Sequence, residues 1–186
     1  MNFCKAIFWV FIAVSTILAG RLVFGYGATT THPGLTDEIA DFYNLSFENK
    51  ITSEEKEWII QGSIDEDTPP RWINHFYDPI SKQGWTGEET GWLPEELMRV
   101  FSFAFLSTQK PVSSIDWASN QTLQSSYGDY KGNRTWQRAI YEYAKGDKKE
   151  AFYTLGFILH LAEDLTVPDH TRNDTHAHDL QIVTGD

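Results

Sequence analysis

The most constraining feature of this 186-residue sequence is an apolar run near the C-terminus that contains two polar side chains. Residues 151–162 leave almost no polar face, which predicts a helix buried on nearly every side. His160 and Asp164 are four residues apart and therefore lie on the same face of that helix. Because unpaired polar groups in an apolar setting cost about 2–7 kcal/mol, both side chains need partners.

The residues that follow this helix favour a metal ion as the partner. Pro168 predicts the end of the helix, and His170 comes two residues later, where the chain can bend back toward His160 and Asp164. Three nitrogen and oxygen ligands with one open position are typical of catalytic zinc sites. In the alternative, His160 and Asp164 only hydrogen-bond to each other or to the backbone.

The N-terminus predicts a secretory signal over residues 1–27. Lys5 precedes an almost uncharged run over residues 6–20, and small residues follow it. An uncleaved membrane anchor is the alternative, although the run is short for a span of about 20 residues. We therefore expect a secreted or periplasmic protein. Cys4, the only cysteine, lies in the signal, so a metal must be held by nitrogen and oxygen.

Residues 28–186 are long enough for one domain, and we expect a monomer. Removing Lys5 and Arg21 from the 15 basic residues leaves 13 against 26 acidic ones, a formal charge of −13. This charge repels polyanions and excludes a broad nucleic-acid-binding surface. The aromatic content of 15% indicates an ordered domain instead of a disordered acidic chain.

Helical patterns predict an all-α fold of about five or six helices, without strand alternation or internal repeats. Thr36 is expected to cap a helix ending near residue 46, and Ser53 a second helix ending between Gly62 and Asp67. A Pro-, Gly- and aromatic-rich stretch predicts one long ordered loop over residues 67–96. The remaining helices are expected from Pro94, over 113–124, over 133–146 and over 147–167.

The six histidines fall into three groups, none on a plainly solvated helix face. His32 precedes the first helix, His75 lies in the aromatic loop, and four others lie near the C-terminus. This distribution favours one convergent polar site. Two alternatives remain: His75 is a loop histidine stacked among aromatic rings, or all the histidines are structural and no metal binds.

Three motifs resemble those of the bacterial zinc-dependent phospholipase C family, whose superfamily also contains single-strand-specific zinc nucleases. They are the H-x-x-x-D-x-x-x-P-x-H run from His160 to His170, the "NHFYDP" motif around His75, and "GSIDED" after the second helix. The resemblance covers residues 32–178. It implies a helical domain with three zinc ions in a cleft.

The resemblance also implies residue roles. Asp67 corresponds to a metal ligand and a candidate general base, with Asp65 as its rival, and His178 competes with His176 for one ligand position. The implied zinc ligands are His32, Asp67, His75, His160, Asp164, His170 and His176.

The sequence departs from the family pattern at both ends. The phospholipases use an N-terminal Trp as a zinc ligand, and no Trp stands near the expected cleavage point at Gly27. The family also supplies a Glu after its last ligand His, but no Glu follows Glu163 here. We therefore expect a C-terminally incomplete domain with an incomplete third zinc site, which could leave this chain inactive.

The implied activity is a phosphodiesterase of the phospholipase C type, in which zinc activates water toward a phospholipid head group. Such an enzyme would contact membrane surfaces transiently. A nuclease is the first alternative, and exposed Trp72, Trp85 or Trp92 would favour it by stacking on bases. A metal-stabilised, non-catalytic binding domain is the second. Arg172 would contact a phosphate or form a surface salt bridge with Asp169 or Asp174.

Overall fold

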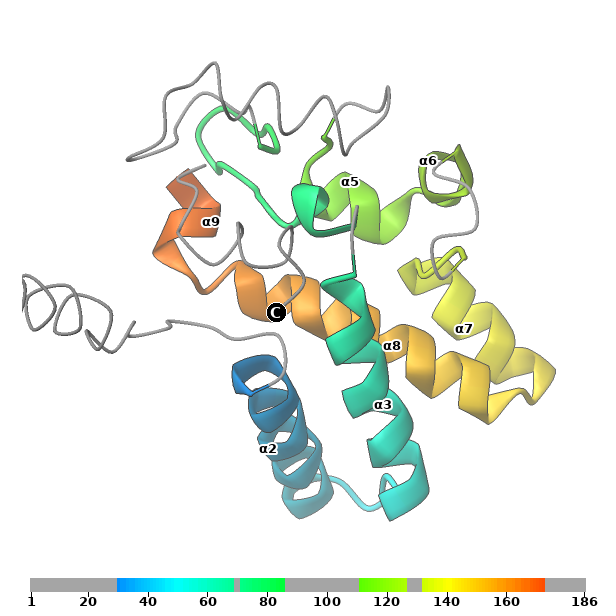
Figure 1. Ribbon diagram of the computed structural model, residues 1–186. Coiled ribbons are helices and arrows are strands. Elements are labelled where there is room, and N and C mark those ends of the chain that lie inside the picture. The colour runs from blue at the N-terminus through cyan, green and yellow to red at the C-terminus, as the bar shows by residue number, and fades with distance from the viewer. Residues whose placement is uncertain (1–29, 69–70, 86–110, 127–131, 173–186) are drawn as a thin grey trace, which may run out of the picture.

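The computed structural model describes residues 30–68, 71–85, 111–126 and 132–172 (Figure 1). Within these ranges the fold is helical, and the only β pairing is an isolated bridge between Asp78 and Gln83. The prediction of an all-α fold is therefore confirmed. The elements are α2 (Thr31–Ser46), α3 (Ser53–Glu66), a 3-10 helix (Arg71–Asn74), α5 (Ser114–Ser119), α6 (Gln121–Ser126), α7 (Trp136–Lys145), α8 (Lys148–Asp164) and α9 (Pro168–Arg172).

Helix α8 is the central element and packs against α2, α3 and α7 (Figure 1). Two glycines set its distance from α3, because Gly62 and Gly156 face each other where the helices cross. A Cβ atom on Gly156 would lie 2.0 Å from the carbonyl oxygen of Ile59. A Cβ atom on Gly62 would lie 2.0 Å from the carbonyl oxygen of Tyr153. Only glycine at both positions allows the two backbones to approach this closely.

The first two helices start earlier than the sequence predicts. Helix α2 begins at Thr31, five residues before Thr36, which is buried and donates its hydroxyl to Glu163 instead of capping the helix. Helix α3 is capped by Thr52 rather than Ser53, because Thr52 forms a capping box with Glu55. The end of α3 at Glu66 lies within the predicted range.

Helix α7 ends at Gly146, as predicted, with φ of +94° at this glycine. Helix α8 ends at Asp164, earlier than expected, and Pro168 opens α9 at a position where proline is well tolerated. The expected single helix over 113–124 is two short helices, because Asn120 has an extended backbone and accepts a hydrogen bond from the N–H of Leu123.

Burial of α8 is less complete than predicted. Its α3-facing side is buried, but several of its large apolar side chains are only half-buried and Ala162 is exposed. The expected helix from Pro94 and the second part of the predicted long loop lie outside the described residues. Among the residues that the structure does describe, no helix has the length and apolar character that a membrane crossing needs.

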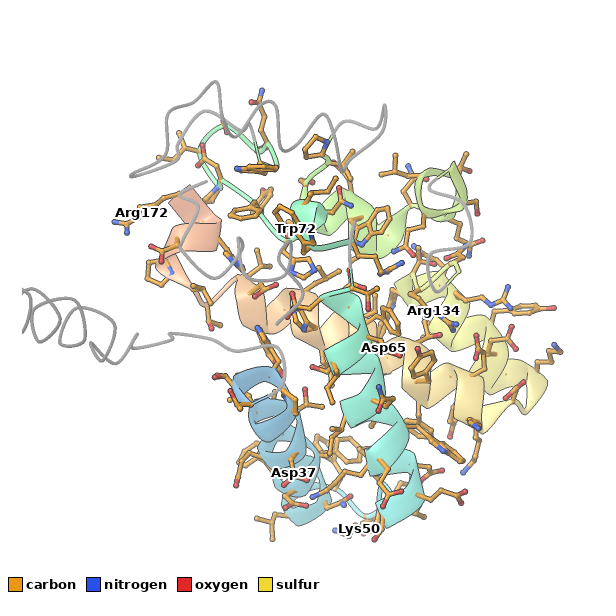
Figure 2. The ribbon with its side chains drawn as sticks, viewed as in Figure 1. Asp37, Lys50, Asp65, Trp72, Arg134 and Arg172 are labelled. Atoms are coloured by element: carbon orange, nitrogen blue, oxygen red, sulfur yellow. The ribbon has the colours of Figure 1, made fainter. Side chains whose placement is uncertain are left out.

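The described part of the aromatic loop, residues 71–85, forms much of the core. Its side chains pack with those of α5 and α8, and Trp72 lies inside the molecule whereas Arg172 lies at its edge (Figure 2). The N–H of Tyr77 donates to the carbonyl oxygen of His170 at 3.0 Å, which joins the loop to α9. The core cluster consists of Trp72, Ile73, Phe76, Trp85, Trp117 and Leu161.

Candidate metal centre

Six polar side chains from five segments converge where α3, α8 and α9 end beside the start of α2. They are six of the seven ligands that the sequence analysis predicts; the seventh, His176, and its rival His178 lie outside the described residues. All but Asp67 are buried. The six residues are His32, Asp67, His75, His160, Asp164 and His170.

The carboxylate of Asp164 is at the centre of this cluster. Its Oδ1 lies 3.3 Å from Nε2 of His32 and 3.0 Å from Nδ1 of His170. Its Oδ2 lies 3.2 Å from Nε2 of His160 and 2.9 Å from Nδ1 of His75. Each oxygen therefore faces two imidazole nitrogens, so this carboxylate is placed to bridge two positions.

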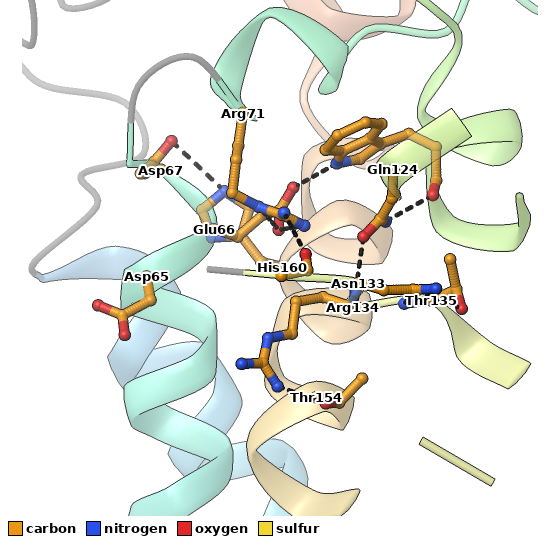
Figure 3. Close-up of polar contacts among 12 residues, drawn as sticks. Asp65, Glu66, Asp67, Arg71, Gln124, Asn133, Arg134, Thr135, Thr154 and His160 are labelled. Carbon is orange, nitrogen blue, oxygen red and sulfur yellow. Dashed lines mark hydrogen bonds and ion pairs between the residues drawn. The ribbon is translucent and has the colours of Figure 1, made fainter. Parts of the chain in front are cut away.

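Asp67 joins the cluster and its rival Asp65 does not. Oδ1 of Asp67 lies 3.5 Å from Nδ1 of His75 and 3.6 Å from Nε2 of His160. Asp65 accepts hydrogen bonds from the Tyr153 hydroxyl and from Nε2 of Gln61, and it points away from His160 (Figure 3). The Asp67 side chain is also the most exposed of the six, at 16%, which makes it the member most accessible to solvent.

The outer hydrogen bond of His160 determines which of its nitrogens carries the proton. Nδ1 lies 2.7 Å from the carbonyl oxygen of Ser63, which can only accept, so Nδ1 is the donor. Ser63 is in the last turn of α3, where carbonyl groups lack intrahelical partners. In the neutral ring, Nε2 therefore presents a lone pair to Asp164, 3.2 Å away.

Two acceptors then face each other inside the protein. Within the described residues, Nε2 of His160 and both carboxylate oxygens of Asp164 are buried without a hydrogen-bond partner, although they lie at contact distance. Buried polar groups are almost always paired, and a lone pair facing a carboxylate is repulsive. A cation between the two groups would satisfy both.

The charge of the site also calls for a cation. Four carboxylates, those of Glu66, Asp67, Glu163 and Asp164, gather around the histidines, and one guanidinium, that of Arg71, offsets Glu66 at 2.7 Å. With neutral histidines, four negative charges and one positive charge leave a net charge of −3 among these groups. Such an excess in a buried site is costly unless protons or metal ions offset it.

Without metal, protonation of His32 and His75 offsets part of this negative charge. Burial lowers the pKa of His32, but the nearby carboxylates of Asp164 and Glu163 favour the charged ring, outweigh burial and raise this pKa to about 9. Burial also lowers the pKa of His75, but the negative charge of Asp164 outweighs burial and raises this pKa well above its ordinary value. Burial raises the pKa of Asp164, but the neighbouring histidines hold it well below its usual range.

The geometry of the cluster also fits a metal ion. Ligand atoms of His32, His160 and Asp164 lie within 4.8 Å of one another, as do those of Asp67, His75 and His160. Two ligands of a tetrahedral ion with bonds of about 2.0–2.1 Å are separated by about 3.3 Å, close to the nitrogen–oxygen distances at Asp164. These residues could hold a metal ion.

Two further acidic residues, Glu163 and Glu66, contact cluster histidines and are not among the residues predicted from the sequence. Nδ1 of His32 lies 2.8 Å from Oε2 of Glu163, and Nε2 of His75 lies 3.6 Å from Oε1 of Glu66. The sequence could have indicated Glu163, because it is a second acidic residue beside Asp164 at the end of an apolar helix. The carbonyl of Ser63 has no such signal, since every residue type carries a carbonyl.

The structure also places the other residues that the sequence singles out, namely the aromatic loop and Arg172. The His75 ring lies 4.7 Å from the His160 ring and is part of the histidine cluster, not only of an aromatic stack. Arg172 is exposed and lies 3.4 Å from Asp169, which matches the salt-bridge alternative (Figure 2). Trp72 and Trp85 are buried in the core, and Trp92 lies outside the described residues.

No protein-family model, curated protein or solved structure matches this chain.

Proposed function

We propose that this protein is an exported, zinc-dependent phosphodiester hydrolase of the phospholipase C type. The observation that carries the proposal is the contact between Nε2 of His160 and Oδ2 of Asp164. The Ser63 carbonyl commits the other ring nitrogen as a donor, so two buried acceptors point at the same space. A divalent cation relieves this conflict and also offsets the excess negative charge of the site.

Zinc suits the ligand set, because imidazole and carboxylate groups are its usual partners where cysteine is absent. One ion would be held by Asp67, His75, His160 and Asp164. A second would be held by His32 and Asp164. His170, with the predicted ligand His176, would contribute to a third position.

Asp67 is the proposed general base. It is the most solvent-accessible member of the cluster, so its carboxylate can accept a proton from water while the buried ligands remain fixed. Bound zinc would supply Lewis-acid chemistry, lowering the pKa of water toward neutrality and offsetting charge on phosphate oxygens.

A phospholipid head group is the proposed substrate, with transient contact to the membrane surface. The acidic chain disfavours long polyanions, whereas a single phosphodiester needs only local cations. The burial of Trp72 and Trp85 also removes two of the three stacking surfaces that would favour a nuclease. A single-strand nuclease and a non-catalytic metal-binding domain are therefore the outcomes against which the proposal is tested.

The test combines elemental analysis with turnover. The purified protein should contain zinc and hydrolyse lecithin or a chromogenic phosphodiester, and a chelator should abolish the activity. Asp67→Asn should lower kcat by about 10²–10⁴-fold, the range for loss of a general acid–base group. Asp65→Asn is the matched control, because Asp65 lies two residues away and contacts Tyr153 instead of the cluster.

Each alternative gives a different result. Bound zinc without chelator-sensitive turnover would identify a non-catalytic domain. Turnover of single-stranded DNA but not of lecithin would identify a nuclease. A protein that contains no zinc and takes up none would overturn the metal site itself.

A further inference from the structure

Glu163 is a buried carboxylate beside the metal cluster that the proposed reaction does not use. It precedes Asp164 on α8, so the two side chains point in directions about 100° apart around the helix. Asp164 faces the centre of the cluster, whereas Glu163 reaches the far side of the His32 ring. Its Oε2 lies 2.8 Å from Nδ1 of His32, and both side chains are only 3% exposed.

The second oxygen of this carboxylate is also held. The Thr36 hydroxyl donates to Oε1 of Glu163 at 2.8 Å and lies 3.1 Å from Oγ of Ser63. Thr36 is one helical turn after His32 on α2, so the same face of α2 supplies both partners of the carboxylate. Glu163 is therefore fixed in position and orientation before any metal binds.

This arrangement constrains His32. A carboxylate on one side accepts the Nδ1 proton, so Nε2 is the nitrogen that faces Oδ1 of Asp164 at 3.3 Å. The ring is also stacked on His160 with a centroid distance of 3.8 Å. A carboxylate behind a ligand histidine fixes its tautomer and orientation and makes it a stronger donor to a metal.

We propose that Glu163 is a positioning residue that holds His32 as a metal ligand and strengthens its bond to the ion shared with Asp164. This inference rests on the proposed function, because it requires that the cluster binds zinc. It assigns Thr36 a supporting role, since Thr36 holds the carboxylate. Other described residues of α2 contribute no ligand to the cluster, so Glu163 controls how this helix takes part in the site.

The experiment is a zinc titration of the full chain against a competing chelator, with Glu163→Gln, Glu163→Ala and Thr36→Val. Glutamine keeps a hydrogen-bond acceptor for Nδ1 but removes the charge, so it separates charge from packing. We expect Glu163→Ala to weaken one class of zinc site by about 10–100-fold, the usual effect of losing an outer-shell partner. Glu163→Gln should have a smaller effect in the same direction, and Thr36→Val a smaller one still.

Glu142→Gln is the matched control. Glu142 is also a buried glutamate, on α7, where it pairs with Arg138 and Lys145 instead of a cluster histidine. It should lower stability while leaving zinc affinity unchanged. A second control is the pair His32→Ala and His32→Ala/Glu163→Gln, which should bind zinc equally, because Glu163 acts only through His32.

The outcomes separate this inference from the proposed function. A wild-type protein that binds no zinc overturns the proposed function. Zinc binding by the wild type with unchanged affinity in Glu163→Gln and Thr36→Val overturns the positioning role, even if Glu163→Ala fails to fold. The positioning role is also overturned if His32→Ala/Glu163→Gln binds zinc more weakly than His32→Ala alone.

Discussion

At the scale of single residues, His160 links the end of a helix to the candidate metal centre. One nitrogen caps a free carbonyl at the end of α3, and the other faces the bridging carboxylate of Asp164. The two contacts are coupled by the ring, because a proton fixed on Nδ1 leaves a lone pair on Nε2. The position of α3 therefore determines which nitrogen is available as a ligand.

Asp164→Asn should remove the bridging carboxylate while keeping the side-chain shape. We expect the loss of at least one equivalent of bound zinc, because the asparagine amide is a weaker ligand and carries no charge. Zinc per chain, measured by elemental analysis after dialysis, checks this. Asp169→Asn is the control, since the side chain of Asp169 is 41% exposed and contacts Arg172, so the substitution should leave the zinc content unchanged.

The stability of metal-free protein should depend on pH in a direction set by His32. Its pKa of about 9 in the folded state exceeds the ordinary value of 6.5. The stabilisation is therefore fully present below pH 6.5 and is lost as pH rises to 9, by at most about 3 kcal/mol. Denaturant titration of chelator-treated protein across this range measures the loss.

With zinc present, the trend should reverse, because metal binding requires deprotonated ligands and strengthens as pH rises. His32→Asn should flatten the pH dependence of the metal-free protein. Equal stability of chelated wild-type protein at pH 6.5 and pH 9 would contradict the assignment of a raised pKa to His32.

The sequence predicts contacts between residues that are close along the chain better than contacts between distant segments. His160, Asp164 and His170 are close in sequence, so helix geometry and Pro168 suffice to predict that they meet. The same reasoning cannot decide whether Asp65 or Asp67 is the ligand, because the exact end of α3 determines which of the two carboxylates faces the histidines. Ser63 is a backbone partner 97 residues from His160, and no local pattern predicts such a contact.

At the scale of helices, the close crossing of α3 and α8 brings the ligands together. Gly156 lies one turn before His160, and Gly62 directly precedes the carbonyl that His160 caps. Gly156→Ala should destabilise the protein by about 3 kcal/mol, at the upper end of overpacking effects, because the new Cβ would meet backbone. It should also weaken zinc binding by moving His160 away from Ser63.

Gly34→Ala provides the matched comparison for this prediction. Gly34 lies in α2, and an added Cβ would meet nothing within 4 Å. The substitution should raise the free energy of unfolding by up to about 1 kcal/mol, because alanine favours helix over glycine. Thermal and denaturant unfolding of both variants should show a loss of stability for Gly156→Ala and a gain for Gly34→Ala. Unchanged stability of Gly156→Ala would contradict the close approach of the helices.

The ends of the helices show what local sequence can and cannot predict. Gly146 is predicted correctly because a positive φ at a helix end depends on the residue itself. Thr36 resembles a cap but is inside α2, because its hydroxyl bonds to Glu163 on another helix. Tertiary contacts of this kind override local propensity and are invisible in a single segment.

At the scale of the whole molecule, zinc should stabilise the folded protein. The ligands come together only on folding, so free zinc at 100 times its Kd should add about 2.7 kcal/mol to the free energy of unfolding. Thermal unfolding measured over a series of zinc concentrations should give a rising Tm. Addition of chelator should reverse the rise, and a Tm independent of zinc would contradict the metal site.

With a single cysteine, this acidic chain cannot form a disulfide within itself, so a metal ion is the cross-link that its side chains could provide. His32 and Asp164 are 132 positions apart in the sequence, so the ion that both are proposed to hold would act as a cross-link. A covalent bridge that closes a loop of about 100 residues restricts the unfolded chain by about 4.7 kcal/mol. Zinc would fill this role in a chain whose only cysteine, Cys4, lies outside the described residues, so the resistance of the protein to unfolding would depend on the metal available around it.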